Sequence, residues 1–266
     1  MSTPNIAPAS VLTISSVLGR ARRILFAQPF IFLALAFIAL LPSMLTSFLG
    51  AEREIKSLGA LLDFILMMIT QGAFAYGVFQ IFTGKSASFG AALSRGMTRF
   101  FPIVGAVLLI SLFFVLVSVL SILPGVLLRS SWLLPLGLLL CLLFLFPWIH
   151  CGWVVAIPAC TVERLGPIRS LERSWELTKG YRWKILGLMT VAYLIFFVFL
   201  FAAVFAYSLL LAFLGLSIDS LPAVLGFVLI LTLPVAFINV VYTTLYYDLR
   251  SVKEGVAVDS LVNVFD

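Results

Sequence analysis

Long apolar runs separated by short polar segments dominate the chain. Six of them exceed the roughly 20 residues that an α-helix needs to cross the hydrocarbon core of a bilayer. The six runs are Ile24–Phe48, Leu58–Phe82, Phe101–Leu123, Trp132–Cys160, Ile185–Leu214 and Leu221–Tyr247. A β-barrel is excluded because its strands are about ten residues long and alternate in polarity. The pattern predicts an all-α bundle of six transmembrane helices, with expected kinks at Pro147 and Pro234.

Composition supports the same class of protein. Apolar residues make up 63% of the 266 positions and charged residues only 11%, whereas soluble domains carry about 25% charged residues. A soluble globular domain and a disordered chain are therefore both excluded. We expect one integral membrane domain over residues 1–266.

The distribution of basic residues predicts the orientation of the bundle. Of the 17 lysines and arginines, all except Arg53, Lys56 and Arg129 lie in segments on the same side as the N-terminus. The positive-inside rule then places both termini in the cytoplasm. Residues Met1–Ser10 form a short polar tail, and the apolar run that follows is longer than a signal-peptide core. We interpret this run as a retained signal-anchor.

The basic excess also indicates the partners. A net charge of +6, almost all of it on the cytoplasmic side, suits anionic lipid headgroups. Nucleic acid is not expected, because no basic stretch forms a separate domain. Cys141, Cys151 and Cys160 all fall in the fourth run without metal-binding spacing, so neither a metal nor a cofactor is expected. The sequence indicates no protein partner or oligomeric state.

Three cytoplasmic segments share a Leu-x-Arg unit, at Leu18–Arg20, Leu93–Arg95 and Leu171–Arg173. Each unit lies in a stretch with apolar residues at helical spacing, which is typical of helices that lie in the membrane interface. The predicted interfacial helices are Thr13–Leu25, Phe89–Phe100 and Pro167–Lys179. With the spans, they suggest three parallel repeats at about 10–82, 83–160 and 161–250; chance similarity of the loops is the alternative.

Two charged motifs stand at the cytoplasmic end of the chain's second half. One runs from Glu163 to Gly180, with Pro167 where a helix tolerates proline and Gly180 where a left-handed residue ends it. The other is Tyr246-Tyr247-Asp248-Leu249-Arg250, followed by Glu254-Gly255. The candidate structural or lipid-contacting residues are Arg20, Arg95, Glu163, Arg169, Arg173, Trp175, Lys179, Asp248 and Arg250.

A carboxylate in this partly desolvated layer needs a cationic partner. We predict that Asp248 pairs with Arg173 or Arg169, which would clamp the third interfacial helix to the end of the bundle. Arg250 would then be free for lipid phosphate or for Glu163. In the alternative, Asp248 points into water and pairs with nothing.

At these two motifs the chain resembles the membrane domain attached to some bacterial glycerophosphodiester phosphodiesterases and its stand-alone six-span relatives. The matching features are Glu163-x-x-Gly166 with Arg173-Ser174-Trp175-x-Leu177-Thr178-Lys179-Gly180, and Tyr246-Tyr247-Asp248-Leu249-Arg250-x-x-x-Glu254-Gly255. The resemblance implies a multi-pass protein of the bacterial cytoplasmic (inner) membrane. Only Ser251–Asp266 follow the last span, which leaves no room for a phosphodiesterase domain, so that activity is not carried over.

Polar residues within the spans are candidates for function, because burying them costs free energy unless they are satisfied. They are Asp63, Gln71, Gln80, His150 and Asn239. We interpret them first as hydrogen-bonding residues between helices, or for Asp63 as a satisfied or snorkelling carboxylate. Roles in proton relay, catalysis or substrate binding are the alternatives.

No hydrolase, metalloprotease, phosphate-binding or dinucleotide-binding motif is present. We therefore favour a non-catalytic integral membrane protein that organises or supports lipids or envelope partners, with no catalytic residues. The alternatives are a transporter or lipid-translocating protein and a membrane enzyme acting on lipid headgroups. A cavity lined by His150, Asn239 and Gln80 would favour transport or catalysis, and a dry, fully packed bundle would favour the first hypothesis.

Overall fold

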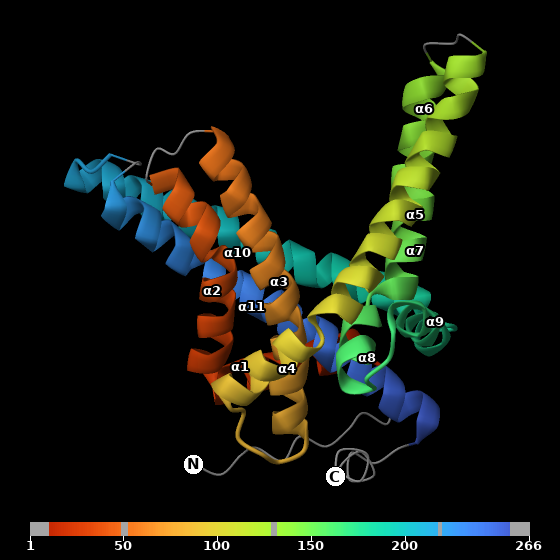
Figure 1. Ribbon diagram of the computed structural model, residues 1–266, viewed down its shortest axis with the longest axis horizontal. Coiled ribbons are helices and arrows are strands. Elements are labelled where there is room, and N and C mark those ends of the chain that lie inside the picture. The colour runs from red at the N-terminus through yellow and green to blue at the C-terminus, as the bar shows by residue number, and fades with distance from the viewer. Residues whose placement is uncertain (1–10, 49–52, 129–131, 218–219, 256–266) are drawn as a thin grey trace.

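The computed structural model describes residues 11–48, 53–128, 132–217 and 220–255, and every regular element in them is a helix (Figure 1). The helices are α1 (Ile14–Ala27), α2 (Pro29–Phe48), α3 (Arg53–Phe82), α4 (Phe89–Thr98), α5 (Phe100–Leu127), α6 (Leu133–Leu140), the π-helix η1 (Cys141–Leu145), α7 (Phe146–Trp153), α8 (Ala156–Val162), α9 (Pro167–Thr178), α10 (Arg182–Leu214) and α11 (Leu221–Glu254). The all-α prediction is confirmed.

Five segments of the described chain are long and apolar enough to cross a membrane, and the bent pair α1–α2 would provide a sixth. The five are Ser57–Phe82, Phe100–Leu127, Pro135–Val162, Arg182–Leu214 and Leu221–Glu254. They indicate an integral membrane protein with several spans. Arg53 lies at the start of α3, whereas Arg129 lies outside the described residues.

The first predicted span is wrong at its start. We expected one helix from Ile24 to Phe48, but Ile24 belongs to α1, and α1 meets the next helix at 92°. The bend lies at Gln28, whose φ of −142° and ψ of 65° are not helical. Pro29 contributes to this bend, because a proline disfavours the helical conformation of the residue before it. The Gln28 side chain then accepts a hydrogen bond from the Ala87 backbone at 2.8 Å, which ties the bend to the loop before α4.

The fourth predicted span is interrupted. A π-helical turn at Cys141–Leu145 precedes Pro147, and α7 ends at Trp153 before α8 begins. Proline has no backbone N–H to donate, so a widened turn just before it is the expected adjustment. In contrast, α11 continues through Pro234 as one helix of 34 residues.

All three segments predicted as interfacial are helical. Thr13 caps α1 by accepting from the Ser16 backbone at 3.3 Å, Pro167 opens α9, and Gly180 after its end has a φ of +87°. The second helix ends at Thr98 rather than Phe100, because α5 begins there. Whether these helices lie at a membrane surface and form three repeats stays a prediction.

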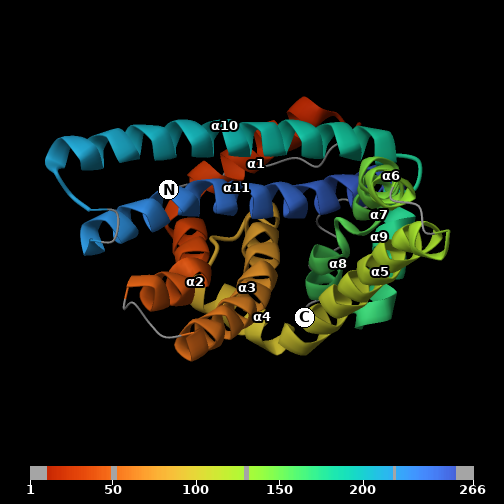
Figure 2. The same ribbon diagram turned by 90° about the horizontal axis from the view of Figure 1, so that it is seen from above.

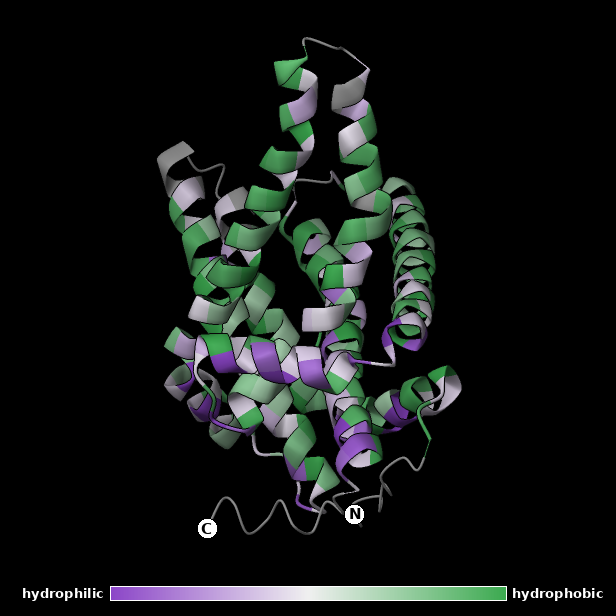
Figure 3. Ribbon diagram, turned by 90° about the vertical axis from the view of Figure 1, so that its right-hand side faces the viewer, coloured by the Kyte–Doolittle hydropathy of each residue, from purple (hydrophilic) through white to green (hydrophobic). Residues whose placement is uncertain are grey.

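Two views show how the helices are arranged. The hairpin α10–α11 runs along one side, with α2 and α3 against one half of it and α5 to α9 against the other (Figure 2). Hydrophilic residues gather in a band across the lower part of the molecule, and the hairpins above it are mostly hydrophobic (Figure 3). The core joins α1, α2, α3 and α11 around Tyr246, Phe32, Phe74 and Ile24, all nearly inaccessible to solvent.

Candidate functional site

A partly open cavity of about 700 Å³ lies between the helices. Helices α2, α3, α5, α7, α8, α10 and α11 all contribute to its wall. Most of that wall is apolar and aromatic, with Phe64, Phe74, Phe114 and Trp153 among the side chains. A cavity of this size with a few polar groups has the dimensions of a small-molecule site. We call it the central cavity.

Four of the five predicted intramembrane polar residues line the central cavity. Asp63 and Gln71 come from α3, His150 from α7 and Asn239 from α11. Asp63 and Gln71 are eight positions apart, about 12 Å along the axis of one helix. Polar groups that are scattered in the sequence therefore share one cavity.

Gln80 is not part of this cavity. Its side-chain oxygen accepts a hydrogen bond from the Ser88 backbone at 3.0 Å, just before α4. Gln80 and Gln28 thus both fix the loop between α3 and α4. Gln80 makes a structural hydrogen bond, as one of our interpretations held, although to a loop rather than to another span.

The polar groups of the cavity differ in how far the protein satisfies them. Asn239 donates to the Val235 carbonyl at 2.9 Å, and Thr243 donates to the Asn239 carbonyl at 3.0 Å. Gln71 and His150 make no hydrogen bond within the described part of the chain. Their amide and imidazole are therefore available to a molecule inside the cavity.

Two tyrosines also line the cavity, and neither was predicted as a candidate from the sequence. The hydroxyls of Tyr193 on α10 and Tyr242 on α11 are hydrogen-bonded to each other and join the two long helices. Both residues look like ordinary members of apolar runs. Only the position of Tyr242 three residues after Asn239, close to the same face of α11, could have linked it to the cavity.

At the hydrophilic end of the bundle, the two charged motifs meet in one network around Glu163. Arg173 donates from Nε to both Glu163 oxygens, at 3.0 and 2.9 Å, and Tyr246 donates its hydroxyl to Glu163 Oε1 at 2.7 Å. Arg250 Nη1 lies 3.7 Å from the same carboxylate. Glu254 is paired with both arginines. The predicted alternative that Arg250 reaches Glu163 is confirmed.

This network raises the pKa of the Arg173 guanidinium. Burial acts to lower the pKa of its guanidinium, but the hydrogen bonds and charges of Glu254 and Glu163 raise that pKa above its ordinary value. The arginine therefore stays charged, and its charge is already compensated. Tyr246 and Glu254 belong to the second charged motif but were not among the predicted site residues. They are eight positions apart, about two helical turns, and this spacing could have indicated that they share a face.

The predicted partner of Asp248 is wrong. Asp248 is fully buried and its Oδ2 accepts from Arg20 Nη2 at 2.6 Å, so its cation comes from α1 and not from α9. Arg173 is occupied by Glu163, and Arg169, one helical turn earlier, is exposed. Arg20 is itself only 8% exposed, so it is a structural residue rather than a headgroup contact.

Helix α9 packs on the bundle through small hydroxyl residues. Ser174 and Thr178 both donate to the Gly152 carbonyl, at 2.9 and 3.2 Å. Trp175 lies over Gly152 and stacks on the guanidinium of Arg182, 3.7 Å from the ring centroid. Ser174 and Thr178 are four residues apart in the sequence, a spacing that suits hydrogen bonds to a neighbouring helix, but the sequence analysis did not predict this contact.

The remaining candidate cations are peripheral. Lys179 is exposed, and Arg95 lies with its guanidinium 5.4 Å from the centre of the Tyr76 ring. Burial and the nearby charge of Arg164 lower the pKa of Arg95. No group of three or more histidine, cysteine or acidic residues placed to hold a metal occurs among the described residues.

Comparison of the chain with protein-family models, with curated proteins and with solved structures finds no match. The resemblance to the membrane domain of glycerophosphodiester phosphodiesterases therefore stays a prediction.

Proposed function

We propose that this integral membrane protein binds a small amphiphilic molecule in the central cavity and carries it within or across the membrane. The observation that supports this is the convergence of Asp63, Gln71, His150 and Asn239 on one cavity with otherwise apolar walls. Such a lining suits a ligand with one polar end and an apolar body. The proposal involves no chemical conversion of that ligand.

The charges of the lining indicate the class of amphiphile. Asp63 is an acid, and no lysine or arginine lines the cavity among the described residues. The described lining therefore offers an anionic headgroup a carboxylate and no basic side chain, which disfavours an anion at this site. A cationic or neutral hydrogen-bonding headgroup fits, with Gln71 and His150 as further partners.

A binding experiment with charged probes tests this proposal. The purified protein, reconstituted in vesicles, is equilibrated with radiolabelled tetraphenylphosphonium as a lipophilic cation and with dodecyl sulfate as an anionic amphiphile. We expect saturable binding of the cation only. Asp63→Asn lowers its affinity about tenfold, the usual effect of losing one charge-assisted contact. Glu172→Gln makes the same chemical change on the exposed side of α9 and serves as the control.

Binding that does not saturate, or that is equal in Asp63→Asn and the wild type, would contradict the proposal. It would favour instead the hypothesis of a non-catalytic protein that organises lipids or envelope partners. The Glu163 network and the Arg20–Asp248 pair, which hold the charged end together, suit that role. Uptake of the cation at a rate above that of protein-free vesicles separates a carrier from a protein that only binds.

We further propose that α1–α2 forms a sixth span and that α1, α4 and α9 lie at the cytoplasmic surface of a bacterial inner membrane. Helices α1, α4 and α9 lie toward the same end of the bundle, which supports this orientation because they carry six arginines: Arg20, Arg22, Arg23, Arg95, Arg169 and Arg173. A reporter fused after Asp266 should be active only as a cytoplasmic fusion. An extracytoplasmic signal would reverse the topology.

A further inference from the structure

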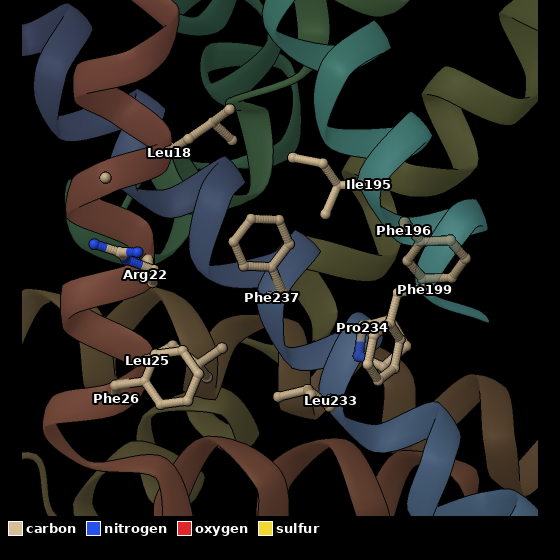
Figure 4. Close-up of a pocket in the computed structure, with 11 residues that line it drawn as sticks. Leu18, Arg22, Leu25, Phe26, Ile195, Phe196, Phe199, Leu233, Pro234 and Phe237 are labelled. Atoms are coloured by element: carbon tan, nitrogen blue, oxygen red, sulfur yellow. The ribbon is translucent and has the colours of Figure 1, made fainter. Parts of the chain in front are cut away.

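A second cavity lies on the outer side of α11, where α1 crosses the α10–α11 hairpin (Figure 4). It has a volume of about 380 Å³. Its walls include Leu18, Leu25 and Phe26 of α1, Phe199 of α10, and Pro234 and Phe237 of α11. We call it the lateral groove.

The lateral groove faces the surroundings of the bundle and not its interior. Phe26 is 65% exposed and Phe199 is 40% exposed. Two of its walls, α10 and α11, are candidate membrane spans. The medium in contact with such walls is hydrocarbon, so an acyl chain is the natural occupant.

One cation stands at this apolar site. Arg22 is the charged residue in the described wall, it is exposed, and no described residue forms an ion pair with it. It lies four residues from both Leu18 and Phe26, so all three share one face of α1. Arg20, on the other side of the helix, is occupied by Asp248.

We propose that the lateral groove binds one acyl chain of an anionic phospholipid, whose phosphate is held by Arg22. Charge complementarity selects this occupant, because an arginine binds a phosphate well and the described wall holds no acid. The groove is separate from the central cavity, since α11 presents Pro234 and Phe237 to the groove and Asn239 to the cavity. Because Arg22 lines the groove and Asp63 lines the central cavity, the two sites select ligands of opposite charge.

Gly19 provides a way to close the groove without disturbing the helix. It lines the groove, and a Cβ built there meets nothing within 4 Å. Gly19→Leu should therefore fill the space normally taken by the acyl chain. Gly90→Leu, on α4, is the matched control, because its Cβ also meets nothing within 4 Å and it lies outside the groove. Replacing glycine by leucine within a helix favours the helix, so both variants should fold.

The test is native mass spectrometry of the delipidated protein titrated with phosphatidylglycerol or phosphatidylcholine of the same chain composition. We expect one tightly bound phosphatidylglycerol in the wild type and in Gly90→Leu, and about tenfold weaker binding in Gly19→Leu. Arg22→Gln should reduce the preference for phosphatidylglycerol about fivefold, the usual contribution of one direct hydrogen-bonded contact to the phosphate. Arg23→Gln removes the same charge beside the groove and should change it less than about twofold.

Equal retention of the two lipids by the wild type would overturn the proposal. Equal losses in Arg22→Gln and Arg23→Gln would do so as well, because they would indicate attraction to α1 as a whole. If Gly19→Leu proved unfolded by circular dichroism, the comparison of the two arginine variants would still decide.

Discussion

Removing one partner of the Arg20–Asp248 pair should destabilise the protein more than any change to its exposed charges. The two side chains are 10% and 1% exposed, and the atoms Nη2 and Oδ2 are 2.6 Å apart. Asp248→Asn leaves a buried guanidinium without a counter-charge, and Arg20→Met leaves a buried carboxylate. Breaking a buried pair in this way costs about 3–5 kcal/mol.

The geometry places the expected value at the lower end of that range. Only one hydrogen bond joins the two groups, and Arg20 Nε and Asp248 Oδ1 have no partner among the described residues. We therefore expect each single variant to lose about 3 kcal/mol of unfolding free energy. The double variant Arg20→Met/Asp248→Asn should lose clearly less than the sum, because no uncompensated charge remains.

The measurement is reversible unfolding of the purified protein in mixed micelles, followed by circular dichroism, as a double-mutant cycle. Arg23→Met, an exposed arginine on the same helix, is the control and should change stability by about 0.5 kcal/mol or less. Single variants within about 0.5 kcal/mol of the wild type, or a fully additive double variant, would refute the assignment of this pair as a structural clamp.

Two further variants test the seat of α9. Glu163→Gln should lower the free energy of unfolding by about 1–2 kcal/mol, because it removes the negative charge that compensates the partly buried Arg173. Arg169→Gln changes an exposed residue of the same helix and should be neutral. Equal unfolding midpoints for the two variants would contradict the network. Gly152→Ala should lower the free energy of unfolding by about 1–3 kcal/mol, because the new Cβ would lie 2.5 Å from the Trp175 ring. Unchanged stability together with a blue-shifted tryptophan emission would contradict this packing.

The helices could be predicted from the sequence because the apolar residues of each span determine its structure locally. Runs of apolar side chains of sufficient length form helices in a membrane wherever their neighbours lie. The break at Gln28 has a local signal, because Pro29 disfavours the helical conformation of the residue before it. Pro42 and Pro234 lie inside continuous helices, so a proline alone did not predict the break. Local chemistry therefore predicts the elements but not every end.

Contacts between distant elements could not be predicted in the same way. The sequence analysis predicted correctly that Asp248 has a cationic partner. Which arginine pairs with it depends on which helix crosses α11 at that level. Arg20 and Asp248 are 228 positions apart, and no pattern in either segment encodes the other. The convergence of Asp63, Gln71, His150 and Asn239 has the same character: each residue stood out alone, and only the packing brings them to one cavity.

The clamp between α1 and α11 also orders the protein's assembly during synthesis. Arg20 is made 228 residues before Asp248, which at about 5–20 residues per second is a delay of roughly 10–45 s. Throughout that interval α1 carries a cation that has no permanent partner. The Arg20–Asp248 pair can form only after the last helix has been made, so a chain that stops before residue 248 has no counter-charge from α11 for Arg20.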